Sequence, residues 1–134
     1  MRTKMNFSDQ LPPIYDRCVE KFGVSFDDGI IFAYGDTIYS KNVPPEDLCV
    51  HEAVHLKQQE DFGGPEKWWD KYLEDDKFRL AQEVEAYRAQ YAYLKKIIKD
   101  RNILFKAMDG IARDLSSSIY GKIVSYWDAI ELLK

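Results

Sequence analysis

The sequence predicts an α+β fold that is mostly helical, and three observations support this class. Apolar side chains recur at spacings of three and four residues through much of the second half, which is typical of amphipathic helices. Two short segments rich in β-branched and aromatic residues flank Gly35-Asp36 and predict a β-hairpin. The length of 134 residues suits one core, and we expect residues 1–134 to form a single domain.

The first half is predicted to contain one helix, the hairpin and a second helix. Pro13 can open a helix that runs to about Phe22, where Gly23 would stop it. The hairpin strands are expected at residues 30–34 and 37–40. A helix with an acidic first turn should then run from Pro45 to about residue 61, before the pair Gly63-Gly64.

The second half is predicted to be helical throughout. A short helix starts at Pro65, and the acidic residues 74–76 separate it from a long helix over residues 77–99. Further helices are expected after Asn102 and over residues 119–133. The long helix has the clearest apolar stripe, made of Leu80, Val84, Tyr87, Tyr91, Leu94 and Ile98.

The composition excludes several classes of protein. With 46% hydrophobic and 14% aromatic residues the chain is not intrinsically disordered. A net charge of -4 disfavours nucleic acid and anionic membranes as main partners. The two cysteines cannot form a disulfide framework, and no apolar run is long enough for a signal peptide or a membrane span. We therefore expect a cytoplasmic protein.

The two histidines of the chain give the sharpest functional signal. They lie four residues apart in the sequence His51-Glu52-Ala53-Val54-His55, so both imidazoles lie on one face of the predicted helix. Two imidazoles in that arrangement can share a zinc ion (Zn2+), and Glu52 can hold a metal-bound water and act as the general base. By chance this arrangement arises with a probability on the order of 0.1%, although helix histidines without metal, or a metal site without hydrolysis, are the alternatives.

A hydrolytic zinc ion needs a third protein ligand and one open position. Cys49 lies about 200° around the helix from His51, so it points away, and Cys18 has no positional argument. The best candidates are therefore Glu83 and Glu85 on the long helix. Glu83 lies roughly 60° from the centre of the apolar stripe and Glu85 roughly 140° away. We favour Glu83 and keep Glu85 as the alternative.

Other residues near these positions have weaker arguments. Gln59 lies one helical turn beyond His55 and either supports the metal site or is an ordinary polar helix residue. An oxyanion could be stabilised by Tyr72, Arg79 or Tyr87, and the sequence does not choose among them. The aromatic pair at positions 68 and 69 is better explained as core packing than as a substrate platform.

The histidine motif, followed by Glu83-Val84-Glu85-Ala86, resembles the zincin metallopeptidases of the gluzincin type. Those enzymes use His-Glu-x-x-His on one helix and a glutamate ligand on a later helix. The resemblance implies a zincin-like core with a small sheet before the metal helix, and it puts Glu83 at the ligand position. The aspartate that would orient a zinc histidine is replaced here by Tyr87.

The segments 55–59 and 68–72 also look like small bacterial and phage-borne zincin-like proteins. The resemblance covers about residues 30 to 95 and implies a minimal zincin, whose cleft is shallow or completed by a protein partner. The predicted function is zinc-dependent hydrolysis of a peptide or protein substrate, with zinc held by three side chains and Glu52 as the catalytic base. The zinc ligands are His51, His55 and Glu83.

Two alternatives remain open at the level of sequence. One is a zincin-fold binding module that keeps the metal, grips a partner and does not turn over substrate. The other is a regulatory protein in which the motif is incidental. Manganese, nickel or cobalt could occupy the same ligands as zinc.

Overall fold

The computed structural model describes residues 5–134, and their fold is mostly helical with one small sheet, which confirms the predicted α+β class. The strands are β1 (Asn6–Ser8), β2 (Phe32–Tyr34) and β3 (Thr37–Tyr39). The helices are α1 (Tyr15–Phe22), α2 (Glu46–Asp61), α3 (Pro65–Glu74), α4 (Asp76–Ile97), α5 (Arg101–Leu115) and α6 (Tyr126–Leu133). Two short 3-10 turns are η1 (Phe26–Asp28) and η2 (Ser118–Tyr120).

The three strands form a mixed sheet in the order β1-β3-β2. Strands β2 and β3 make the predicted antiparallel hairpin, and Gly35 adopts the left-handed backbone (φ 69°) that its turn requires. Strand β1 was not predicted, and it pairs with β3 in parallel. This order leaves β2 at one edge of the sheet.

Two predicted helix boundaries were wrong. The first helix begins at Tyr15, two residues after Pro13. The segment 119–133 is not one helix, because Gly121 takes a left-handed conformation (φ 87°) that ends η2. A new helix, α6, starts only after Ser125, whose hydroxyl accepts a hydrogen bond from the backbone N–H of Asp128.

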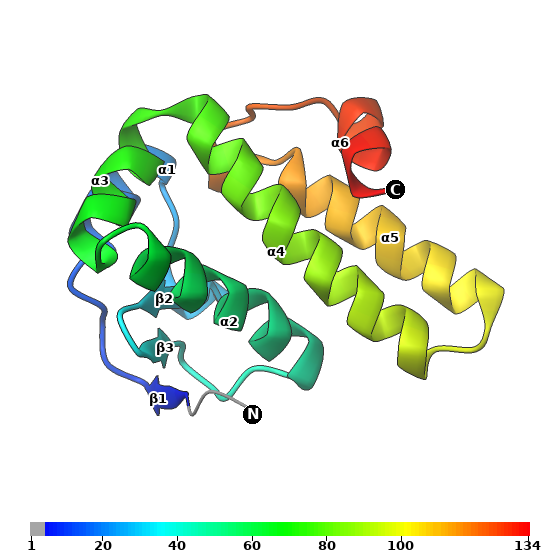
Figure 1. Ribbon diagram of the computed structural model, residues 1–134, viewed down its shortest axis with the longest axis horizontal. Helices are drawn as coiled ribbons and strands as arrows, with labels where there is room; N and C mark the ends of the chain where they lie inside the picture. Colours follow the sequence, from blue (N-terminus) through cyan, green and yellow to red (C-terminus); the bar gives the residue numbers. More distant parts are fainter. Residues whose placement is uncertain (1–4) are drawn as a thin grey trace.

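Helix α2 lies at the centre of the molecule, with the sheet along one side and α4 along the other (Figure 1). Helices α4 and α5 run side by side in opposite directions, and α6 closes against α5. No helix within residues 5–134 is long and apolar enough to cross a membrane.

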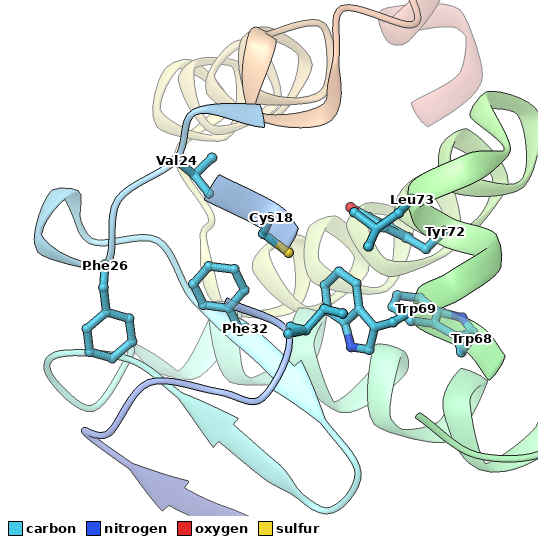
Figure 2. Close-up of a cluster of buried hydrophobic side chains, with 9 residues drawn as sticks. Cys18, Val24, Phe26, Phe32, Trp68, Trp69, Tyr72 and Leu73 are labelled. Atoms are coloured by element: carbon cyan, nitrogen blue, oxygen red, sulfur yellow. The ribbon is translucent and has the colours of Figure 1, made fainter. Parts of the chain in front are cut away.

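The buried apolar side chains gather in two clusters, one on each side of the interface between α2 and α4. The first joins α1, β2 and α3, and Figure 2 shows its side chains filling the space between these elements. The second joins α4, α5 and α6. We call the first the sheet-side cluster, which includes Cys18, Phe32, Trp68, Trp69 and Tyr72. We call the second the helical cluster, which includes Tyr87, Ile111, Ala112, Leu115 and Leu133.

Between the two clusters, α2 and α4 bury a group of polar side chains, which we call the polar seam. The buried residues of α2 include both histidines, Glu52 and two glutamines, while α4 buries Arg79, Glu83 and Gln90. Arg79 is 1% exposed, and its guanidinium donates to the backbone carbonyls of Tyr72 (2.6 Å) and Tyr120 (2.9 Å). It therefore ties η2 to the end of α3 beside the polar seam.

Candidate metal centre

Three ligand-type side chains from α2 and α4 converge in the polar seam. The Nε2 atoms of His51 and His55 lie 3.2 Å apart. The Oε1 atom of Glu83 lies 3.1 Å from the former and 3.2 Å from the latter. All three side chains are buried, with at most 4% of each residue exposed. The three residues form a group that could hold a metal ion.

The spacing of the three atoms fits a small divalent cation. Ligand atoms at about 2.0 to 2.1 Å from a tetrahedral metal lie about 3.3 to 3.4 Å from one another. The observed separations of 3.1 to 3.2 Å are close to that value. The two helices therefore already place the ligand atoms at nearly the distances that a bound ion requires.

Two glutamines fix which nitrogen of each imidazole faces this centre. The Nδ1 atom of His51 lies 3.0 Å from Oε1 of Gln90, and Nδ1 of His55 lies 2.8 Å from Oε1 of Gln58. An amide oxygen only accepts hydrogen bonds, so each Nδ1 must carry a proton and donate. In a neutral imidazole that leaves Nε2 as an unprotonated ligand atom.

Two carboxylates in turn fix the orientation of the glutamine amides. The Nε2 atom of Gln90 donates to Asp47 at 2.9 Å, and that of Gln58 donates to Glu85 at 2.6 Å. Because the NH2 ends face carboxylates, the oxygen ends must face the histidines. Glu85, the alternative third ligand, thus lies behind His55 and outside the group of ligand atoms.

The electrostatics of the group call for a positive charge at its centre. Burial opposes the charged form of His55, but the charge and hydrogen bond of Glu83 outweigh it and raise the pKa of His55 to about 9. Burial also opposes ionisation of Glu83, yet the two histidines hold its pKa well below the ordinary value. A proton on His55 satisfies this demand in the absence of an ion, and metal binding would release that proton.

Glu52 lies beside the group and faces a cavity of about 260 Å³. Its Oε2 atom is 3.9 Å from Nε2 of His51. Burial raises the pKa of Glu52, the two histidines oppose the rise and Glu83 adds to it. The cavity is bordered by the segment 29–33, which includes the start of edge strand β2, and by residues of α5 and η2. Glu52 therefore lies where a general base would act on a metal-bound water.

The three candidates for an oxyanion donor have different environments. The hydroxyl of Tyr72 donates to Oε2 of Glu83 at 2.7 Å and so supports that carboxylate. The donors of Arg79 bind backbone carbonyls and Asp76, so they do not point at the centre. The hydroxyl of Tyr87 lies 2.6 Å from that of Tyr120, and both tyrosines line the cavity.

The structure places the remaining candidates away from the centre. Gln59 is fully buried but accepts from the backbone N–H of Gly35 and donates to the carbonyl of Ala33, so it fastens the hairpin to α2. Cys49 lies near the carbonyl of Pro44. Cys18 and the two tryptophans belong to the sheet-side cluster, as expected for core residues.

Each histidine ring also contacts one apolar cluster. The ring centroid of His55 lies 5.3 Å from that of Trp68 in the sheet-side cluster. The ring centroid of His51 lies 4.3 Å from that of Tyr87 in the helical cluster. Tyr87 therefore packs on the ring of His51, and Gln90, one helical turn later on α4, makes the hydrogen bond that orients this ring.

Sequence reasoning missed Gln58, Gln90 and Tyr120. The helical period could have indicated the first two, because Gln58 follows His55 by three residues and Gln90 follows Glu83 by seven, which returns to the same helix face. No local pattern points to Tyr120, since it reaches the cavity only through the turn η2.

No family model, no curated protein and no solved structure matches the chain. The function must therefore be inferred from the residues of the chain themselves.

Replacing Gln90 with Leu should weaken zinc affinity about 10- to 100-fold, because His51 loses the acceptor that keeps its proton on Nδ1. The same loss is expected for Gln58→Leu at His55. A competition titration against a chromogenic chelator measures the affinity. Gln82→Leu, in which Gln82 contacts Trp68 instead of a histidine, is the matched control. Equal affinities for all four proteins would contradict the orienting role.

Proposed function

We propose that the chain is a zinc-dependent peptide hydrolase with a zincin-like core. His51, His55 and Glu83 would hold the ion, and Glu52 would take a proton from the water and pass it to the leaving amine. The observation that supports this most directly is the convergence of the three ligand atoms at 3.1 to 3.2 Å beside a buried glutamate that faces a cavity. Zinc is the ion that this ligand set favours.

The surroundings of the cavity support a peptide as the substrate. Strand β2 is an edge strand, and the segment 29–33 at its start lines the cavity. The backbone of an extended segment can bind a peptide through hydrogen bonds. Because the carbonyl of Ala33 in β2 already accepts hydrogen bonds from Gln59 and Trp69, a peptide would align with residues 29–31, just before the strand. The volume of about 260 Å³ is slightly below the usual range for ligand sites, which favours a short peptide or the end of a chain.

The test is cleavage of a peptide library by the zinc-loaded chain, followed by mass spectrometry. We expect discrete cleavage products that disappear when a chelator removes the ion and return when zinc is added back. A chain with one bound zinc that cleaves no peptide in the library would contradict the proposal.

One observation favours a second candidate, a partner-binding module that keeps the metal without turnover. The ligands and Glu52 are at most 6% exposed, and most of the cavity lining is apolar or aromatic. Such a wall suits a tightly held, slowly released segment of a partner protein. Capture of a stoichiometric partner by a zinc-loaded chain that cleaves nothing would support this candidate.

A further inference from the structure

One carboxylate at the cavity has no role in the proposed chemistry. Asp114 lies in the last turn of α5, and it lines the same cavity as His51 and Glu52. Glu83 belongs to the candidate ligand group and Glu52 is the proposed base, so Asp114 is the acidic lining residue that remains. Its side chain is exposed to solvent at this border.

No cationic side chain balances Asp114. Within the described residues 5–134, no lysine or arginine lines the cavity, and the carboxylate makes no ion pair and no hydrogen bond. The adjacent Arg113 turns away and pairs with Asp109 at 2.9 Å.

The rest of the cavity lining is mostly apolar or aromatic, which strengthens the electrostatic effect of the Asp114 carboxylate inside the cavity. The other lining residues include Ile119 and Tyr120 of η2, and Phe22, Ile30 and Phe32. Apolar walls lower the local dielectric and focus the field of a charge into a cleft. A cationic group entering here meets an unbalanced negative charge, and an anionic group is repelled.

We propose that this cavity selects substrates with an ammonium group next to the bond that is cleaved, and that Asp114 is the residue that recognises it. The inference rests on the proposed function. The ammonium group can come from the free amino terminus of a peptide or from a lysine side chain. Both present N–H donors of the same chemistry to the carboxylate.

The test uses small hydroxamates, which bind zinc without being hydrolysed. The first pair is leucine hydroxamate and its N-acetyl derivative, which differ in a free amino terminus. The second pair is Nα-acetyl-lysine hydroxamate and Nα-acetyl-norleucine hydroxamate, which differ in a side-chain ammonium. Each is titrated calorimetrically into the zinc-loaded full chain at pH 7, where the amines are protonated.

We expect the cationic member of at least one pair to bind about five- to tenfold more tightly than the neutral member. Asp114→Asn should remove that preference. Asp128→Asn, which removes the same charge from an exposed position on α6 outside this cavity, should keep it. The pair that shows the preference identifies the source of the ammonium group.

The results that would overturn this inference differ from those that would overturn the proposed function. Equal ratios in the wild type and Asp114→Asn, or equal binding of both members of each pair, overturn the inference even if the chain hydrolyses peptides. An Asp114-dependent preference in a chain that cleaves nothing supports the recognition and refutes the hydrolase. Absence of hydroxamate binding by the zinc-loaded wild type refutes both.

Discussion

Glu52→Gln should retain one zinc per chain and lose peptide hydrolysis by roughly 10²- to 10⁴-fold, which is the usual contribution of a general base. The reason is chemical and not structural. Glutamine has nearly the shape of glutamate, so the buried position beside His51 remains filled. It cannot take a proton from a metal-bound water. The measurement is the rate of product formation together with elemental analysis of the same sample.

Glu60→Gln is the matched control, because Glu60 is exposed on the same helix. It should leave both the rate and the zinc content unchanged. Full activity in Glu52→Gln would refute the assignment of the base, whereas loss of zinc in that variant would show that Glu52 acts on the metal site itself.

Glu83→Ala should lose more zinc affinity than the 10- to 100-fold expected for a residue that only orients a ligand. The substitution removes the oxygen atoms that lie 3.1 to 3.2 Å from both imidazoles, and it leaves two ligands. In the wild type, zinc at 100 times its dissociation constant should raise the free energy of unfolding by about 2.7 kcal/mol. For a chain of this length that is a rise in Tm of about 10 °C. Glu83→Ala should lose nearly all of this rise.

Glu85→Ala distinguishes between the two candidate ligands. Glu85 accepts a hydrogen bond from Gln58 and does not face the imidazoles, so its loss should leave one zinc per chain and most of the thermal shift. The reverse pattern, with zinc lost from Glu85→Ala and kept in Glu83→Ala, would place the third ligand at Glu85. Zinc content and thermal unfolding are measured on both variants side by side.

Local signals predicted the fold where structure depends on neighbours in the sequence. The hairpin turn at Gly35 and the helix break at Gly63-Gly64 are set by backbone conformations that glycine adopts readily. Strand β1 could not be predicted this way, because three residues are too few to establish an alternating pattern and they gain their structure from a parallel partner about thirty residues away. The division between η2 and α6 was missed because the apolar spacing of residues 119–133 continues across it.

The candidate site was predictable to the extent that helix phase determines it. The phase argument chose Glu83 over Glu85, and the structure places the carboxylate of Glu83 against both imidazoles. The path from Asp47 through Gln90 to His51 was not predictable, because it joins residues 43 and 39 positions apart. Only the packing of α2 against α4 brings them together.

The position of the histidines between the two apolar clusters has a consequence for the mechanics of the chain. Small proteins open locally in cooperative units, and such units often follow separate clusters of apolar contacts. His55 packs on one cluster, His51 on the other, and Glu83 faces both. An ion bound at this seam would have to be released before the two halves could part. The free energy of metal binding would then also set how often the seam between them opens.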